Sequence, residues 1–437
     1  MIKTLLLLFT VTGAFQEPDS TLSAEEAVSI ALEKNFDIRL EKFNLDISKN
    51  NNTYGNAGFF PTVDIGAGAS QSIRNTDQTL DFGEGPVQQS QSGAKNTNYN
   101  AGINLEWTVF DGLKMFATKE KLDQFARANQ SAFKAQIQNV ISDVLKAFYN
   151  AALEQERLSL LQSTLELSEE RVVISKNKYE VGKASKLEFL QAQVDFNTDQ
   201  SAYVRQQEVI ALRKYELQQL LGITPISDSI SLKYSYELEF VKSRGEAEDI
   251  ALIQNPDLQF LLEQKEVSIL TTKELERERL PSLDFNLGYN YSKQESEVGV
   301  LRSNQATGFN YGVTASMTLF DGMNQHRNIQ NAKIQSEQAM TMYDRAKAQL
   351  ITSVRSAFMT YQNAVTLADL ETKNLEVAQE NIEIALERYR VGKSNPLEIR
   401  EAQNNAVDAK IRQLEAINTA KIAEIELMRL TGEILKD

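Results

Sequence analysis

Four segments of the chain alternate between apolar and polar residues with a period of two. The clearest covers 309–319, where the odd positions are apolar and the even positions are small or polar. Similar alternation follows Pro61, covers 103–109, and follows Pro281. This period is typical of β-strands that separate a wet side from an apolar side. Each segment has about 10 to 13 residues, enough for a tilted membrane strand, although a soluble sandwich with one wet face has the same pattern.

Within each half of the chain, the two strands are expected to be joined by a polar loop rich in Gly, Ser and Asn. These loops fall roughly at 73–97 and 293–307. Long loops on one side are typical of the exposed end of a membrane barrel. Four strands are too few to close a barrel, so a membrane barrel would need several copies of the chain.

The longest segments have the periodicity of helices. Residues 113–181 and 323–391 contain neither Gly nor Pro over 69 residues each. Their apolar residues recur at alternating intervals of four and three, which predicts coiled-coil helices of about 100 Å. Shorter helices are predicted at 36–55, 183–221, 257–280 and 393–431. Gly182 and Gly392 lie between long and short helices, where a left-handed residue reverses the chain.

The same landmarks occur twice, 210 residues apart. Residues 107–112 correspond to 317–322, residues 179–183 to 389–393, and residues 221–222 to 431–432. This spacing predicts a tandem duplication in which each repeat contains a helix, a β-hairpin and a pair of long helices. The first repeat covers 21–222 and the second covers 243–437, with a linker at 223–242 in an equatorial region. Residues 1–14, extending to about 20, have the pattern of a secretory signal peptide.

Composition excludes several classes of function. The net charge of −14 disfavours nucleic acid, whose phosphates need a basic partner. The chain has no cysteine and one histidine, His326, so most zinc sites and His-based catalytic triads are excluded. No motif of a hydrolase or a nucleotide-binding enzyme is present. We therefore expect no enzyme activity, no cofactor and no metal site.

Several features together resemble the TolC-like outer-membrane efflux protein family, the outer membrane factors. They are the opening 22–27, the strand ends 109–112 and 319–322, the helix tips 179–182 and 388–392, and the order of both halves. The resemblance implies an α+β membrane protein that forms a homotrimer. Each chain would give four strands to a 12-stranded outer-membrane β-barrel, continuous with a long antiparallel coiled-coil α-helical barrel in the periplasm.

The resemblance implies a passive exit duct of a tripartite efflux or type I secretion system. Its partners would be a periplasmic adaptor protein, an inner-membrane pump and outer-membrane lipid. The residues alone leave one alternative, an extracellular or cell-surface structural coiled-coil protein without a pore. That alternative explains the long helices but not the four strands in matched pairs.

The resemblance also implies a gate at the helix tips. Glu398 and Glu401 correspond to the family's aperture carboxylates, Glu188 to an acidic residue of the first tip, and Tyr389 to a tyrosine that holds the entrance shut, beside Arg388. The adaptor would dock on the exposed tip residues Tyr179, Val181, Gly182, Val391 and Gly392.

The spacing of two of these glutamates is also consistent with a structural role. Glu188 and Glu398 each lie three residues after an N-cap side chain, which is the spacing of a capping box. Glu401 has no such role and would otherwise be a plain solvated charge. In a three-fold assembly, Glu398 and Glu401 would form a ring of carboxylates that favours cations.

Overall fold

The computed structural model describes residues 21–434 apart from 82, 84, 225–229, 239, 241 and 300. The predicted signal peptide at 1–14, extending to about 20, lies outside the described residues. The chain forms two compact units. Unit 1 comprises Met1–Lys42, Ala132–Leu258 and Ala346–Asp437, and unit 2 comprises Phe43–Ser131 and Gln259–Arg345. Each unit therefore contains parts of both sequence repeats.

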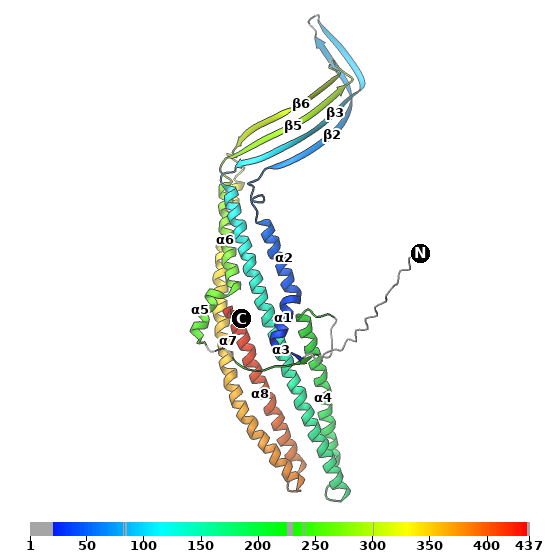
Figure 1. Cartoon of the computed structure of the whole chain (residues 1–437), viewed down its shortest axis with the longest axis vertical. Coiled ribbons are helices and arrows are strands. Elements are labelled where there is room, and N and C mark those ends of the chain that lie inside the picture. The colour runs from blue at the N-terminus through cyan, green and yellow to red at the C-terminus, as the bar shows by residue number, and fades with distance from the viewer. Residues whose placement is uncertain are drawn as a thin grey trace, which may run out of the picture. The chain divides into compact units, whose positions relative to one another are not determined.

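The two units differ in secondary structure (Figure 1). The long helices α3 (Lys114–Glu180) and α7 (Asn324–Arg390), and the shorter α2 (Phe36–Asn51) and α6 (Pro256–Arg277), contribute residues to both. The other elements of unit 1 are β1 (Thr21–Leu22), α1 (Ala24–Lys34), α4 (Lys186–Leu220), β4 (Ser231–Leu232), α5 (Arg244–Gln254) and α8 (Pro396–Thr431). The other elements of unit 2 are β2 (Thr62–Asp81), β3 (Pro86–Phe110), β5 (Ser282–Ser296) and β6 (Ser303–Ser316).

The predicted helices are confirmed, and their ends lie within a few residues of the predicted positions. In unit 1, α8 runs antiparallel to α3. Its contacts extend from Gln403, which donates to Ser168 Oγ at 3.1 Å, to Arg429, which donates to Asn139 at 3.1 Å. Val144 and Phe148, two of the predicted apolar positions of α3, are completely buried. The periodicity therefore identified the face of α3 that packs in the core.

Hydrogen bonds at the helix ends follow the predicted duplication. Asn35 ends α1 and donates to the carbonyl of Leu220 at 2.8 Å, while Asn255 ends α5 and donates to the carbonyl of Leu430 at 3.1 Å. The two asparagines are 220 residues apart, and the two acceptors are 210 residues apart. The repeats therefore share their local contacts as well as their sequence landmarks.

The four predicted strands form one antiparallel sheet in the order β2-β3-β5-β6. The predicted long loops were wrong. β2 has 20 residues and β3 has 25, and they pair up to Asp81 and Pro86, so only 82–85 connect them. In the second hairpin, the connection is 297–302. The polar residues continue the ladder because a hairpin exposed on both faces needs no apolar alternation to pair.

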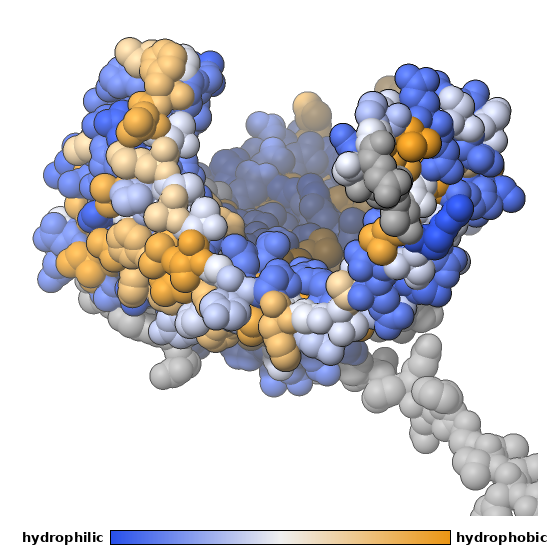
Figure 2. Space-filling model, turned by 90° about the horizontal axis from the view of Figure 1, so that it is seen from above, coloured by the Kyte–Doolittle hydropathy of each residue, from blue (hydrophilic) through white to orange (hydrophobic). Residues whose placement is uncertain are grey.

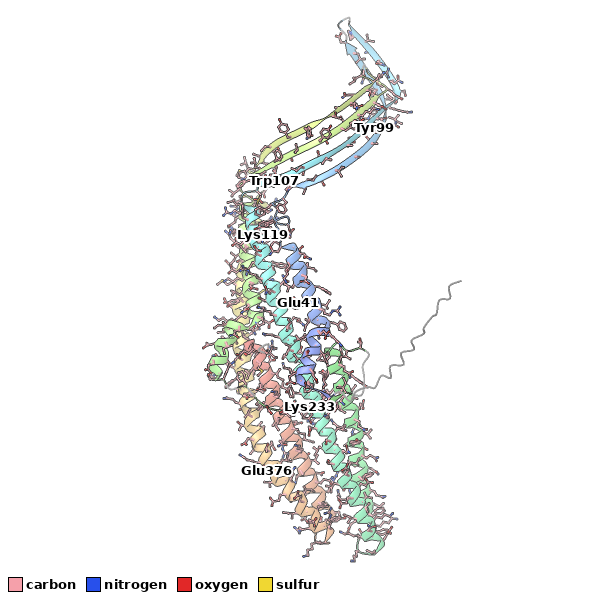
Figure 3. All side chains as sticks on the ribbon, in the orientation of Figure 1. Glu41, Tyr99, Trp107, Lys119, Lys233 and Glu376 are labelled. Atoms are coloured by element: carbon pink, nitrogen blue, oxygen red, sulfur yellow. The ribbon has the colours of Figure 1, made fainter. Side chains whose placement is uncertain are left out.

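The apolar face of this sheet is largely exposed. Phe309 is 75% exposed, Tyr311 79% and Ile65 83%. Figure 2 shows clusters of hydrophobic residues exposed among hydrophilic ones on the surface seen from above. On β3, Tyr99 and Trp107 belong to this face and lie toward opposite ends of the segment that pairs with β5 (Figure 3). An exposed apolar face of this extent indicates contact with lipid or another apolar partner.

The opposite face is small and polar. Asn290 donates to Asn310 at 2.6 Å and lies 3.5 Å from Asn104, so three strands share one row of amides. A Cβ at Gly288 would lie 2.6–2.9 Å from these three amide groups. Glycine is therefore needed here because the amide side chains fold over the backbone of β5.

Part of the predicted linker at 223–242 crosses two helices of unit 1. Lys421 of α8 donates to the carbonyl of Glu237 at 2.7 Å, and the backbone N–H of Phe240 donates to Glu424 of α8 at 2.8 Å. Tyr361 of α7 donates to the carbonyl of Phe240 at 3.2 Å. These contacts fasten the segment to α7 and α8, while its equatorial position stays a prediction.

Candidate functional site at the helix tips

Unit 1 contains two helix tips, the turn between α3 and α4 and the turn between α7 and α8. As predicted, Gly182 and Gly392 adopt left-handed φ angles of 72° and 75°. The N–H of Lys183 donates to the carbonyl five residues earlier at 2.7 Å, and the N–H of Lys393 does the same at 2.8 Å. These are the hydrogen bonds of a helix end that closes on a left-handed glycine.

Each tip forms only half of the predicted capping box. The backbone N–H groups of Glu188 and Glu398 donate to the N-cap side chains at 3.2 and 2.9 Å. The Glu398 carboxylate does not return to its own N-cap. It pairs with Arg388 at 3.1 Å and accepts from Ser394 Oγ at 2.8 Å. Glu398 therefore holds the second tip turn together through its side chain.

Tyr389 of the second tip is 3% exposed and is held by a residue of the first tip. The Lys178 ammonium donates to the Tyr389 carbonyl at 2.7 Å and lies 3.8 Å from the ring centroid. Burial raises the pKa of the Tyr389 hydroxyl, and the nearby Glu188 carboxylate adds to this rise. Burial also lowers the pKa of the Lys178 ammonium, and Glu188 only partly opposes that decrease. Sequence reasoning missed Lys178, although it corresponds to Arg388 in the other repeat.

The predicted docking residues are at the surface, although the two tips differ at the tyrosine, which is exposed in the first tip and buried in the second. Tyr179 is 40% exposed and stacks on Phe189 with ring centroids 6.3 Å apart. The tips also share a pair of exposed aliphatic side chains, which the sequence reasoning identified only in part. They are Val181 at 68% and Leu187 at 74% in the first tip, and Val391 at 66% and Leu397 at 75% in the second.

Glu401 lies three residues after Glu398 on α8, about one helical turn further along. Its side chain is exposed, and no residue in the described part of the chain forms a hydrogen bond or ion pair with it. The structure therefore joins Glu398 to Arg388 and places Glu188 near Tyr389, but it leaves the Glu401 carboxylate unengaged.

Further along the helices, charged side chains from α3, α4 and α8 form a buried polar cluster. Arg400 of α8 binds Asp199 of α4 through two hydrogen bonds of 2.7 and 2.9 Å. Arg171 of α3 donates to Asp195 of α4 at 2.9 Å and to Gln403 of α8 at 3.0 Å. The remaining member of the cluster is Ser168 of α3, which donates to Asp199.

Burial shows how strongly this cluster is engaged. Arg171 and Gln403 are 2% exposed, and Asp199 is 8% exposed. The hydrogen bond to Asp199 raises the pKa of the Arg400 guanidinium, despite the opposing effect of burial. The sequence analysis did not identify this cluster.

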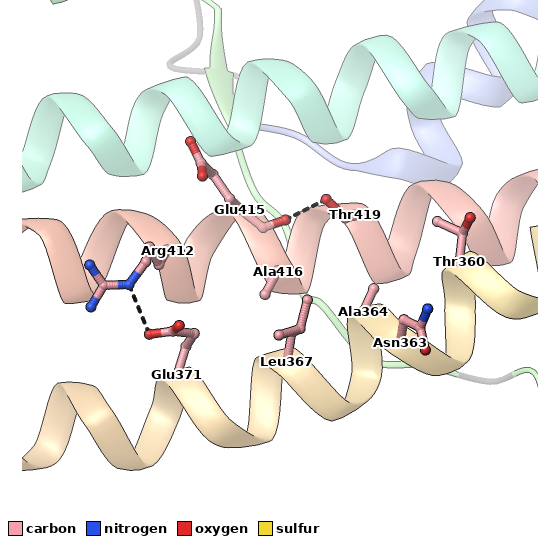
Figure 4. A pocket seen from close by; sticks show the side chains of 9 residues that line it. All are labelled: Thr360, Asn363, Ala364, Leu367, Glu371, Arg412, Glu415, Ala416 and Thr419. Atoms are coloured by element: carbon pink, nitrogen blue, oxygen red, sulfur yellow. Dashed lines mark hydrogen bonds and ion pairs between the residues drawn. The ribbon is translucent and has the colours of Figure 1, made fainter.

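A groove lies between α7 and α8 (Figure 4). It is lined by aliphatic, hydroxyl and amide side chains and by Glu415, and Arg412 pairs across it with Glu371 at 3.1 Å. In the described residues, no group of His, Cys, Asp and Glu side chains is arranged to hold a metal ion. No helix in the described part of the chain is both long enough and apolar enough to cross a membrane.

A four-stranded sheet with an exposed apolar face, together with long paired helices that end in two matching tips, defines the class of outer-membrane channel proteins. The sequence matches the outer membrane efflux protein family over residues 27–223 and 229–433. The chain belongs to this family, and its location is the outer membrane, with an extension into the periplasm. The family consists of channel proteins rather than enzymes.

Individual relatives are distant in sequence but similar over most of their length. The chain is 22% identical to the probable efflux pump outer membrane protein TtgC of Pseudomonas putida, covering 93% of this chain and 82% of that protein. It is 22% identical to protein CyaE of Bordetella pertussis, covering 86% of this chain and 77% of that protein. The Campylobacter jejuni CmeC outer membrane channel has the same fold, with a TM-score of 0.81, 17% identity, and coverage of 94% and 85%.

Proposed function

We propose that three copies of this chain form a passive exit duct of a tripartite efflux or type I secretion system, gated at its periplasmic tips. The observation that carries the proposal is the sheet, which is apolar and exposed on one face and small and polar on the other. Such a sheet suits a barrel wall with lipid outside and water inside. A secreted coiled-coil protein would have no use for it.

The edges of the sheet support closure by copies of the same chain. Within the described residues, β2 and β6 each pair on one side only. Because the four strands alternate in direction, β6 of one copy would run antiparallel to β2 of the next. Unpaired edges in lipid are costly, so closure into a ring satisfies them. Three copies would supply the strands of a 12-stranded barrel, above the minimum of about eight.

The duplication also indicates which helix faces meet between copies. α6 contacts α3 of its own chain, where Glu274 accepts from Thr118 at 2.6 Å and pairs with Lys121. On α2, the corresponding helix of the first repeat, a stripe of four apolar side chains is more than half exposed. They are Phe36 at 54%, Leu40 at 60%, Phe43 at 54% and Ile47 at 57%. By the repeat relation, α7 of a neighbouring copy would cover this stripe.

The tips have the properties of an entrance that can open. The Arg388–Glu398 pair is about half exposed on both sides, and such a pair contributes only about 0–1 kcal/mol, so it can exchange partners at low cost. The exposed aliphatic pairs of the two tips offer matching surfaces to a periplasmic adaptor. Docking of the adaptor and pump would shift the tips toward an open state, and the chain itself would perform no chemistry.

Within this entrance, Glu401 is proposed as the main determinant of ion preference. The Glu398 carboxylate is already engaged by Arg388 and Ser394, whereas the Glu401 carboxylate is unengaged in the described part of the chain. A ring of unengaged carboxylates at a narrow opening favours cations more than a ring of paired ones. Glu401→Gln should therefore reduce cation preference more than Glu398→Gln.

The test is single-channel recording of the purified protein in planar lipid bilayers, with reversal potentials measured in a salt gradient. The wild type should conduct with cation preference, and the two glutamine variants should rank as stated. Conduction with unchanged selectivity in Glu401→Gln would keep the duct and remove Glu401 from its narrowest part. A protein that stays in the soluble fraction and never inserts would support the structural coiled-coil alternative.

A further inference from the structure

The buried polar cluster of Ser168, Arg171, Asp195, Asp199, Arg400 and Gln403 has no counterpart at the equivalent positions of the other repeat. Shifting each residue by 210 positions gives Ala378, Asn381, Asn405, Ala409, Leu190 and Gln193. The cluster contains four charged side chains, and the counterpart set contains none. The duplication relates α3 to α7 and α4 to α8, so the cluster on α3, α4 and α8 corresponds to a set on α7, α8 and α4.

The cluster connects α8 to both helices of the first tip pair. Gln403 donates to Ser168 Oγ at 3.1 Å and to the Thr164 carbonyl at 3.3 Å, both on α3. Arg400 is bound by Asp199 on α4, with side-chain exposures of 19% and 10%. Ile399, between these contacts and the tip, is completely buried. The first turns of α8 are therefore held to their own chain on the side opposite the exposed Glu401.

The counterpart set would lie where α8 meets α4 of the next copy in a ring. There Ala409 takes the place of Asp199, and Leu190 takes the place of Arg400. Two charge-assisted hydrogen bonds between an arginine and a carboxylate fix one geometry, so an interface that contains such a pair is more constrained than one without it. The interface of α8 with α4 within the chain has one charged pair, Arg400 with Asp199, and the interface between copies has none at the equivalent positions.

We infer that Arg400, Asp199 and Gln403 are positioning residues of the entrance, which keep α8 bound to α3 and α4 of its own chain while the tips separate between copies. This inference rests on the proposed duct. The interface that opens is then the one between α8 of one copy and α4 of the next copy. The contacts of Arg400 and Gln403 also keep α8 from rotating about its axis, so the Glu401 side chain keeps its orientation.

The first test is the double variant D199A/R400L, which gives this interface the residues that the other interface already has. Resting conductance in planar bilayers should rise several-fold above wild type, with weaker cation preference because Glu401 is no longer oriented. The charge-exchanged variant D199R/R400D should return both readouts toward wild type, which a general loss of structure would not allow. Wild-type conductance and selectivity in D199A/R400L would overturn the inference.

The second test uses the absence of cysteine from the chain, so introduced pairs can be cross-linked specifically. After treatment with a bismaleimide, D199C/R400C should be linked within one chain and should open as it does before treatment. The matched pair L190C/A409C should be linked between chains, as covalent oligomers, and should lose conductance. The reverse pattern would overturn the inference. If wild type and all variants are inserted but silent, the proposed duct itself fails.

Discussion

Four glycines related by the duplication allow two effects of a Gly→Ala substitution on stability to be separated. One is the cost of a side chain on a left-handed backbone, and the other is the cost of a steric clash with neighbouring atoms. Gly182, Gly392, Gly222 and Gly432 have φ angles of 72°, 75°, 67° and 76°. A Cβ at either tip glycine would meet no atom within 4 Å. A Cβ at Gly222 would lie 2.5 Å from the Lys34 carbonyl oxygen. A Cβ at Gly432 would lie 2.8 Å from the Gln254 carbonyl oxygen.

These distances set the expected losses of stability. Alanine at a tip glycine carries only the left-handed penalty of about 1–2 kcal/mol, partly offset by about 0.4–1 kcal/mol from the less flexible unfolded chain. Gly222→Ala and Gly432→Ala also push against a backbone oxygen at the junction of helices. Overpacking adds about 1–3 kcal/mol. The crowded pair should therefore lose about 2 kcal/mol more than the tip pair.

The assay is urea denaturation of the purified, detergent-solubilised protein, followed by far-ultraviolet circular dichroism. Asparagine tolerates left-handed angles better than alanine, so Gly182→Asn should recover much of the loss and Gly222→Asn should not. Equal losses at both pairs of glycines would refute the reasoning, because backbone conformation alone would then account for the requirement.

Three further outcomes are expected. Burial opposes ionisation of the Glu426 carboxyl, but hydrogen bonds from its two cationic partners hold its pKa below the ordinary value of 4.5, so its contribution is present above pH 4.5 and lost as the pH falls through the folded pKa. Glu426→Gln should therefore flatten the acid side of the stability profile measured by urea denaturation. Asn255→Ala should cost about 2 kcal/mol in the same assay, because a side chain 3% exposed donates to the Leu430 carbonyl at 3.1 Å and accepts from Leu258 N–H at 2.9 Å. Trp107 is the single tryptophan, so brominated lipids should quench its fluorescence if the apolar face meets the membrane, and unquenched emission from inserted protein would contradict that assignment.

The strands and helices could be predicted because their signals are local. Alternation over 309–319 and the helical period of α3 both reflect which face is apolar. The strand pattern can be recognised from a few residues, and the helix pattern from a few turns. The extension of the first hairpin could not be predicted in the same way. Apart from the paired Leu80 and Val87, its residues near Asp81 and Pro86 show no alternation of apolar and polar positions, so only the partner strand determines that they pair.

The tips were predictable to the extent that backbone conformation requires particular residues. Gly182 and Gly392 follow from the need for a left-handed residue after a long helix. The contact of Lys178 with the Tyr389 carbonyl could not be read from spacing, because it joins residues 211 positions apart. Glu398 was correctly placed beside its N-cap, yet its carboxylate binds Arg388 because a cation on the adjoining helix competes with a backbone N–H for the same group.

The polar cluster was missed for a different reason, and the duplication contains the signal that could have revealed it. A charge on a long helix is ordinarily solvated, so Arg171 and Asp199 gave no indication of burial when taken singly. Compared between repeats, the positions change in pairs. Arg171 and Asp195 correspond to two asparagines, whereas Asp199 and its partner correspond to alanine and leucine. Positions that are charged together in one repeat and neutral together in the other are those that touch, because an unpaired buried charge is costly in either one. A duplicated chain thus supplies a comparison within itself, which can identify buried ion pairs from one sequence.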